Sequence, residues 1–295
     1  MLKVVLCVLG QKGLNLVKGS LDALEPFQVV HVIIGKDKEV KNDFSEEIMM
    51  YCREHNIESS IRGNIELSEL SYNYVLAAGW RWLIPHVDNK LIVFHDSLLP
   101  KYRGFAPLVN ALMNREPLVG VTALYGTEDY DCGNILCQKS ISVVYPTTIG
   151  EMIDRISLLY RELSYELLSR FRKQINIEPG VPQIESMATY SLWRDQDDYR
   201  IDWNQSAKEI EHFISCLSYP YSGASAKVDG EIIRIISVKQ IPDIVIENRE
   251  AGKVIFIKNG FPVVVCGEGL LEVQEAVFND GSNFLPLKIF RTRFL

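Results

Sequence analysis

The hydrophobic pattern of the first 175 residues alternates between short continuous apolar runs and longer amphipathic stretches. The apolar, β-rich runs cover residues 2–9, 27–35, 72–79, 90–95 and 119–126. Such runs are typical of strands buried on both faces, and the amphipathic stretches between them are typical of crossover helices. We therefore expect an α/β fold with a Rossmann-like, mostly parallel sheet domain.

The pattern changes twice after residue 148. Residues 148–171 carry apolar positions at helical spacing behind a Thr148–Glu151 capping box, which predicts a long helix. Residues 175–189 hold two prolines and a glycine without a clear period, and we interpret them as an interdomain linker. A helix signal at about 205–217 and short alternating runs separated by glycine turns follow, which predict a small β-rich, OB-like domain. The predicted division is a first domain at 1–175, a linker at 176–203 and a C-terminal domain at 204–295.

Composition agrees with a folded protein of two domains. The chain has 295 residues, of which 47% are hydrophobic and 23% charged. Its net charge of -7 argues against a long nucleic acid as the main partner. The six cysteines form no C-x-x-C pair and the five histidines show no metal-ligand spacing, so we expect free thiols and no metal. The apolar start is too short for a membrane span and lacks a secretory cleavage site, which favours a cytoplasmic protein without membrane attachment.

Candidate chemistry begins at the predicted strand that ends at His95. Ligands of open α/β sheets bind beyond the carboxyl ends of the strands, and Asp131 lies in the loop after the next predicted strand. If the two strands are neighbours, the side chains converge. Acyl transfer to an amine requires a base and stabilisation of an oxyanion, and an imidazole beside a carboxylate suits both tasks. A single histidine is more often structural, so residue types alone leave the role of His95 open.

The turn after the first predicted strand is a weaker candidate. Its sequence, GQKG at 10–13, offers backbone N–H groups and Lys12 to a ligand diphosphate at a helix N-terminus. It matches neither the dinucleotide-binding glycine pattern nor the P-loop pattern. A plain strand-to-helix turn is at least as good an interpretation.

Two motifs carry a family resemblance. HDSLLPKYRG at 95–104, followed by GVTALYGTEDYDCGNIL at 120–136, resembles the signature of folate-dependent formyltransferases, H-x-S-L-L-P-x-x-R-G and then G-V-T with D-x-G-x-I. The likeness extends over most of residues 1–175. After residue 200, IDWNQSAKEIEHFISCLSYPYSGA more weakly resembles the C-terminal domain of methionyl-tRNA and amino-sugar formyltransferases. The resemblance implies transfer of a formyl group from 10-formyltetrahydrofolate to an amine, with His95 and Asp131 as catalytic residues.

The resemblance also implies binding residues. Those expected to contact the folate are Trp80, Leu83, Ile84 and Tyr130. Those expected to contact the substrate are Gln11, Lys12, Ser97, Arg103 and Gly104. For the aromatic and aliphatic members, ordinary core and turn positions are the competing interpretation. For Arg103 and Gly104, the favoured interpretation is a structural loop that shapes the site.

One position departs from the family pattern. The family has an asparagine two residues before the histidine, whose amide binds the formyl oxygen, whereas this chain has Val93. Valine has no side-chain donor, and loss of one oxyanion donor typically costs about 2.7–4 kcal/mol. We expect another group to supply the donor, with a backbone N–H, Asn110 and Asn134 as candidates. The alternative is a chain that keeps the fold and has lost the activity.

Charge favours one class of acceptor amine. Residues 201–295 contain 12 Asp plus Glu against 10 Lys plus Arg, a balance of -2, and show no basic stripe for an RNA acceptor stem. We therefore expect a nucleotide-linked amino-deoxysugar, for surface polysaccharide biosynthesis. A methionyl-tRNA formyltransferase and a non-catalytic binding protein for folate or nucleotide sugar are the alternatives. A homodimer is left open.

Overall fold

The computed structural model describes residues 1–84, 91–173 and 179–295. The chain forms two compact units, residues 1–144 with 151–193 and residues 145–150 with 194–295. The predicted linker at 176–203 is therefore divided between them. Within the described ranges, no helix has the length and apolar character that a bilayer crossing requires.

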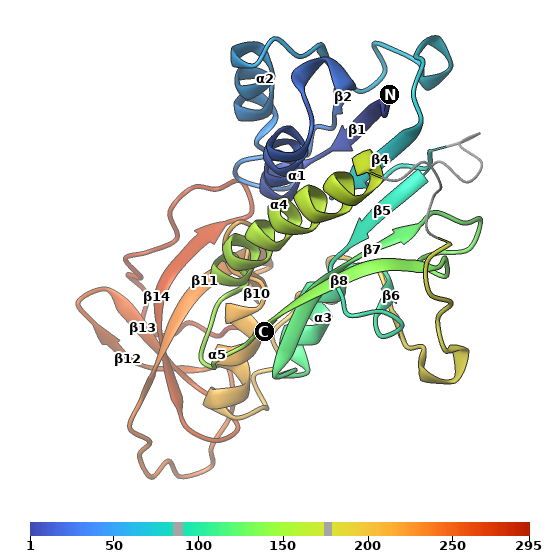
Figure 1. The fold of residues 1–295 in the computed structure, drawn as a ribbon. Helices are drawn as coiled ribbons and strands as arrows, with labels where there is room; N and C mark the ends of the chain where they lie inside the picture. The colour runs from blue at the N-terminus through green and yellow to red at the C-terminus, as the bar shows by residue number, and fades with distance from the viewer. Residues whose placement is uncertain (85–90, 174–178) are drawn as a thin grey trace. The chain divides into compact units, whose positions relative to one another are not determined.

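The first unit is built on a seven-stranded sheet (Figure 1). Its strands are β1 (Val4–Val8), β2 (Val29–Ile34), β3 (Ser59–Ile61), β4 (Tyr74–Ala78), β5 (Leu91–His95), β7 (Leu118–Tyr125) and β8 (Ile135–Ser142), in the order β3-β2-β1-β4-β5-β7-β8. The first five strands are parallel, whereas β7 is antiparallel to β5 and β8 is antiparallel to β7. This sheet confirms the predicted mostly parallel α/β fold.

The strands that the apolar pattern predicts are those that are buried on both faces of the sheet. All five residues of β1 and all five of β4 are buried, as expected for central strands of a covered parallel sheet. Strand β8 lies at the sheet edge, where its residues alternate between more and less exposed positions. The continuous apolar signal is therefore missing from β8, and the sequence analysis did not predict this strand.

Helices cover the sheet and fix its loops. They are α1 (Gly10–Ala23), α2 (Ser45–Glu54), α3 (Pro107–Met113) and α4 (Ile149–Lys173), with short 3-10 turns η1 (Pro26–Gln28), η2 (Leu67–Glu69) and η3 (Glu185–Met187). Figure 1 shows α4 lying across one face of the sheet beside α1, and the Ser164 hydroxyl donates to the Leu16 carbonyl between them (3.4 Å). A two-stranded ladder joins β6 (Arg103–Gly104) to β9 (Tyr190–Ser191).

The second unit holds a separate five-stranded antiparallel sheet. Its order is β10-β11-β14-β13-β12, from β10 (Ala224–Val228), β11 (Glu231–Ile241), β12 (Val254–Lys258), β13 (Phe261–Val265) and β14 (Leu270–Phe278). Helix α5 (Ala207–Ser215) begins after Ser206, whose hydroxyl accepts the Glu209 N–H as an N-cap. This unit confirms the predicted β-rich C-terminal part.

Candidate active site

The candidate site lies at the carboxyl end of β5. Alternation along the strand places Leu91, Val93 and His95 on one face of the sheet. Strand β5 lies between β4 and β7, with Val93 opposite Ala77 on one side and Leu124 on the other. The last residue of the strand, His95, therefore stands at the rim where ligands of such sheets bind.

The structure brings His95 and Asp131 together. The His95 Nδ1 atom lies 3.4 Å from Asp131 Oδ2, and the two side chains are only 8% and 13% exposed. On the other side of the ring, Nε2 lies 2.8 Å from the Tyr102 carbonyl oxygen. A carbonyl only accepts, so Nε2 is the nitrogen that carries the proton in neutral His95. The lone pair of Nδ1 is then the basic atom, and it faces the carboxylate.

Two glycines allow Asp131 to reach this position. The Gly104 N–H donates to Asp131 Oδ2 at 2.9 Å, and Gly104 has a φ of +96° that favours glycine. A Cβ atom at Gly104 would also lie 2.7 Å from the Ser191 carbonyl oxygen. In the loop of Asp131, a Cβ at Gly133 would lie 1.8 Å from the Tyr125 carbonyl oxygen. The R-G and D-x-G motifs thus supply close backbone approaches on which the pair depends.

The loop after His95 is braced by β7 and β8. The Ser97 hydroxyl donates to the Lys101 carbonyl at 2.7 Å, and the Thr122 hydroxyl donates to the Ser97 carbonyl at 2.6 Å. The Gln138 amide donates to the Leu99 carbonyl (2.9 Å) and to the Thr122 hydroxyl (2.8 Å). Ser97 thus holds its own loop, and its contact with substrate stays a prediction. Thr122 stands in the G-V-T motif but was given no role, and Gln138 was missed because an isolated polar residue on a strand gives no motif.

Arg103 is buried inside the same loop region. Its side chain is 1% exposed, and Nε and Nη2 donate to Gln183 Oε1 at 3.1 and 3.0 Å. Its Nη1 donates to Glu185 Oε2 at 2.9 Å and to the Tyr190 hydroxyl at 3.1 Å. These contacts support the interpretation that Arg103 shapes the loop.

Lys12 takes part in a second charged cluster. Its ammonium pairs with the carboxylate of Asp96, which also accepts a hydrogen bond from the Tyr160 hydroxyl at 2.5 Å. Burial, and then the charge of Asp96, raise the pKa of Tyr160 well above its usual value, so the phenol stays neutral. Gln11 lies in the first turn of α1, partly buried, and its carbonyl accepts from the Asn15 amide. Substrate contacts of Gln11 and Lys12 stay predictions.

The predicted folate residues divide by exposure. Trp80 and Ile84 are partly buried and pack on the sheet, whereas Leu83 is 86% exposed. Tyr130 is 68% exposed and contacts the ring of Phe105, with 5.4 Å between ring centroids. The core cluster under Trp80 and Ile84 comprises Val5, Cys7, Ile33, Val75 and Ala77. Trp80 Nε1 is buried without a hydrogen-bond partner among the described residues.

The amide missing at Val93 has no replacement on β5. Val93 is partly buried between the neighbouring strands. Of the two candidate amides, Asn110 Nδ2 donates to the Ala106 carbonyl and Asn134 Nδ2 donates to the Pro179 carbonyl, each at 2.9 Å. The Asn110 amide thus bonds within its own helix, whereas the Asn134 amide joins its loop to the segment at Pro179.

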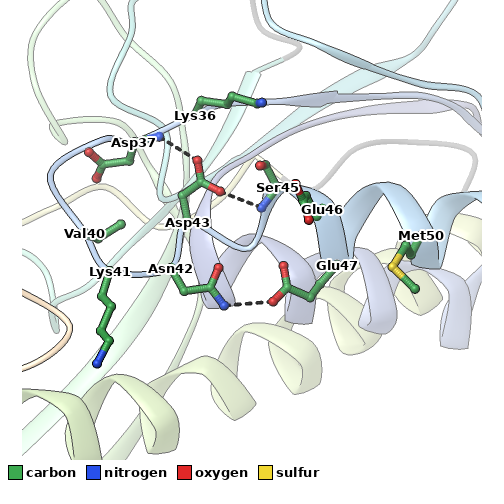
Figure 2. A pocket seen from close by; sticks show the side chains of 10 residues that line it. All are labelled: Lys36, Asp37, Val40, Lys41, Asn42, Asp43, Ser45, Glu46, Glu47 and Met50. Carbon is green, nitrogen blue, oxygen red and sulfur yellow. Dashed lines mark hydrogen bonds between the residues drawn. The ribbon is translucent and has the colours of Figure 1, made fainter.

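A polar hollow of about 580 Å³ is lined by the loop that follows β2 and by the first turns of α2 (Figure 2). Its lining residues are Lys36, Asp37, Val40, Lys41, Asn42, Asp43, Ser45, Glu46, Glu47 and Met50. The Gly10 N–H donates to the Asp43 carbonyl, so the hollow adjoins the turn of Gln11 and Lys12. Four carboxylates against two lysines line it, which disfavours an anion such as a diphosphate. Among the described residues, no group of three or more His, Cys, Asp or Glu side chains is placed to hold a metal.

Two family models match the chain. Residues 10–169 match the family described as Formyl transferase, and residues 194–292 match Formyl transferase, C-terminal domain. The fold and these matches define an enzyme that transfers a formyl group. The chain belongs to the formyl transferase family and is an N-formyltransferase.

Individual relatives differ in the acceptor that their names give. The methionyl-tRNA formyltransferase of Lactococcus lactis is 26% identical over 289 residues, 92% of this chain and 89% of the relative. An N-formyltransferase from Helicobacter canadensis, solved with folinic acid and dTDP-3-aminofucose, has a TM-score of 0.67 at 20% identity, covering 93% of this chain and 99% of its own. HypX from Aquifex aeolicus, solved with tetrahydrofolic acid, has a TM-score of 0.65 at 16% identity, covering 94% of this chain. This chain spans only 44% of the HypX chain.

Proposed function

We propose that the enzyme transfers the formyl group of 10-formyltetrahydrofolate to the amine of a nucleotide-linked amino-deoxysugar, in the cytoplasm and for surface polysaccharide. The observation that carries the proposal is the His95–Asp131 pair at the rim of a formyl transferase sheet. The sugar is supported by the Helicobacter canadensis structure, which matches nearly end to end and holds a dTDP-amino sugar. The C-terminal charge balance of -2 agrees, because RNA binding requires concentrated positive charge.

We assign each site residue a task in amide formation that its geometry allows. The Tyr102 carbonyl keeps the proton of neutral His95 on Nε2, so Nδ1 accepts the proton that the amine loses. Asp131, 3.4 Å away, then accepts a hydrogen bond from the new Nδ1–H and stabilises the imidazolium. The Gly104 N–H holds the carboxylate for this purpose. When bound, the folate supplies the electrophilic formyl carbon.

The residues present fit a folate at the same edge. Trp80 and Ile84 lie on the face of the sheet that carries Val93 and His95, and they offer partly exposed apolar surface to a flat ring. The buried Nε1 of Trp80 has no hydrogen-bond partner in the described part of the chain, and it is a donor that a pterin acceptor would satisfy. We propose that Trp80 and Ile84 hold the pterin and that the more exposed Leu83 and Tyr130 border the folate.

A second candidate follows from the relatives' names. Methionyl-tRNA formyltransferase is the name of the Lactococcus lactis relative, whose similarity extends over 92% of this chain. A third candidate, a protein that binds these ligands without turnover, is supported by Val93, which has no donor for the formyl oxygen.

One assay separates the three candidates. Purified protein is mixed with 10-formyltetrahydrofolate and thymidine-, uridine- or guanosine-diphosphate amino sugars, or with charged initiator tRNA. Release of tetrahydrofolate together with a formamido sugar supports the proposed function. Turnover with the tRNA alone would refute the sugar proposal. Binding of both ligands by calorimetry without any turnover would support the non-catalytic candidate.

A further inference from the structure

Two residues of the site, Tyr102 and Asp131, share an unusual backbone conformation. Tyr102, whose carbonyl accepts from His95, has a φ of +60°, and Asp131 has a φ of +55°. The left-handed region is disfavoured for residues with a Cβ atom and costs of the order of 1–3 kcal/mol. Such a conformation persists when neighbouring groups fix it. Both residues are fixed by one segment, residues 183–191.

Gln183 provides the main connection. Its Nε2 donates to the Asp131 carbonyl at 2.7 Å and to the Gly133 carbonyl at 2.8 Å. Its Oε1 accepts both Nε and Nη2 of the buried Arg103. A single amide therefore joins the loop that carries Asp131 to the residue that precedes Gly104, and the Gly104 N–H binds the Asp131 carboxylate.

The same segment fixes the histidine side of the pair. The Tyr102 N–H donates to Thr189 Oγ1 at 2.9 Å, and the Arg103 N–H donates to the Thr189 carbonyl at 2.8 Å. The Tyr102 carbonyl is then directed at His95 Nε2. Because this bond determines which imidazole nitrogen carries the proton, Thr189 acts on the base through Tyr102.

We infer that Gln183 and Thr189 are positioning residues of the transfer reaction: they hold the Asp131 carboxylate and the Tyr102 carbonyl against the two nitrogens of His95. The inference rests on the roles proposed above for His95 and Asp131. Neither residue belongs to the H-x-S-L-L-P or D-x-G motif. Their segment contributes no atom that binds the His95 ring itself among the hydrogen bonds of the described residues, so they act indirectly.

The first test is Gln183→Glu. Glutamate keeps an oxygen for Arg103, but its second oxygen has no hydrogen for the Asp131 and Gly133 carbonyls. We expect kcat to fall about 100-fold, the effect of a displacement of about 1 Å at a reacting group, with KM for the amine and the folate changed less than about threefold. A fall in kcat with little change in KM indicates that the substitution displaces the reacting groups, whereas loss of a binding surface would raise KM.

Gln28→Glu is the matched control. Gln28 is buried, whereas Gln183 is partly buried, and the Gln28 Nε2 donates to the Leu2 carbonyl at 3.0 Å, before the amino end of β1. Gln183→Glu removes two amide-to-carbonyl bonds at a partly buried place, and Gln28→Glu removes one at a buried place in the same unit, so we expect similar drops in thermal midpoint. Only Gln183→Glu is expected to lower kcat per folded molecule. Equal kcat values for the two variants would overturn the inference.

Thr189 supplies a test that does not depend on the folding of the Gln183 variant. Thr189→Val keeps the shape and removes the acceptor of the Tyr102 N–H, whereas Thr189→Ser keeps the hydroxyl. We expect Thr189→Val to lower kcat about tenfold, less than Gln183→Glu because Thr189 is exposed to water. Thr189→Ser should restore kcat to within about twofold of wild type. Equal activity of the two Thr189 variants would remove Thr189 from this role.

A measurement without substrate separates this inference from the proposed function. The turnover assays use whichever amine the wild type formylates. If that amine is on a tRNA, the sugar proposal is refuted, but the kcat values of the variants can still be compared. If no amine is formylated, the ¹⁵N spectrum of the His95 imidazole is recorded instead. We expect the Nε2–H form in wild type and Gln28→Glu, and a mixture of both forms in Thr189→Val. An unchanged spectrum in Thr189→Val would overturn the inference.

Discussion

Two neighbouring residues at the end of β5 lead to two charged clusters of similar burial. His95 faces Asp131, with side chains that are 8% and 13% exposed. Asp96, the next residue, pairs with Lys12, with side chains that are 13% and 16% exposed. Asp96 also contacts Tyr160 of α4, whereas His95 contacts the loop at Tyr102.

The clusters differ in how their charges are satisfied. Each Asp96 oxygen has a donor, the Lys12 ammonium for one and the Tyr160 hydroxyl for the other. In the other cluster, the two acceptors His95 Nδ1 and Asp131 Oδ2 stand 3.4 Å apart when His95 is neutral, so a proton is needed to join them. Burial alone therefore does not identify a reactive group. An incompletely paired buried base beside a carboxylate is the better candidate, because gaining a proton improves its contacts.

The largest difference between the clusters should appear on removal of His95. We expect His95→Ala to lower kcat about 10²–10⁴-fold, the usual contribution of a general base, and to lower the thermal midpoint by only about 2–4 °C. His31→Ala is the matched control, since His31 is also buried and has a side-chain bond to Ser60 (2.9 Å). Activity in His95→Ala equal to that of the control would remove His95 from catalysis.

Sequence patterns predicted the elements whose signal is local. Strands β1 and β4 are buried on both faces and appear as continuous apolar runs, and the sequence of α4 has a long apolar period that follows a capping-box pattern at Thr148–Glu151. Strand β8 was missed because an edge strand has only one buried face. The loop before α2 was expected to be part of an amphipathic stretch, but Asp43 accepts the N–H groups of Asp37 and Ser45 there. The next residue, Phe44, has a left-handed φ of +56°, so the helix begins only at Ser45.

Only those site residues that stand in sequence motifs could be predicted from the sequence. His95 and Asp131 stand in sequence motifs, and strand order brings them together. Gln183 lies in a segment without periodicity that was interpreted as a linker, and its bonds reach residues about 50 and 80 positions away. A pairing over such separations leaves no local pattern in the chain. For the same reason, the sequence did not predict that Asp96 pairs with Lys12 and accepts from Tyr160.

Substitution of Asp96 should affect the stability of the protein more than its activity. We expect Asp96→Asn to lower the free energy of unfolding by about 3 kcal/mol, because it removes the carboxylate charge that pairs with the Lys12 ammonium in a mostly buried place. Activity per folded molecule should stay within about threefold of wild type. Urea unfolding and kcat are the measurements.

A double variant checks the cause of that loss. Lys12→Met combined with Asp96→Leu replaces both charges by apolar groups, and we expect it to recover much of the stability. If the double variant is as unstable as Asp96→Asn, the ion pair is not the source of the loss. If its KM for the amine rises tenfold, Lys12 also contacts the substrate, as the sequence analysis predicted.

Tyr160 should make the stability of its cluster depend on alkaline pH. Its pKa is raised in the folded state by burial and by Asp96, so the folded state holds the phenol proton longer than the unfolded chain. The contribution is therefore complete below the unfolded value of about 10 and is lost as pH rises above it, by about 1.4 kcal/mol per pH unit. We expect wild type to lose more stability than Tyr160→Phe between pH 9.5 and 11, measured by urea midpoints. Parallel pH curves would contradict this assignment.

The smallest expected effect concerns Val93, which lies on the same face of β5 as His95. Two residues along a strand span about 6.6 Å, so a carboxamide at position 93 would reach toward the reacting centre beside His95. We expect Val93→Asn to raise kcat less than tenfold, well below the 2.7–4 kcal/mol of an evolved oxyanion donor, because the surrounding groups do not hold the new amide in place.

The control for this variant is Val93→Leu, which has nearly the shape of asparagine and no donor. Both variants must fit between Ala77 and Leu124, so both should lose about 1–2 kcal/mol of stability. A higher kcat in Val93→Asn than in both Val93→Leu and wild type means that the wild-type site lacks a donor at this place. If asparagine and leucine lower kcat equally, an amide at position 93 does not serve the formyl oxygen in this site, and the family's asparagine is no guide to how this chain stabilises the oxyanion.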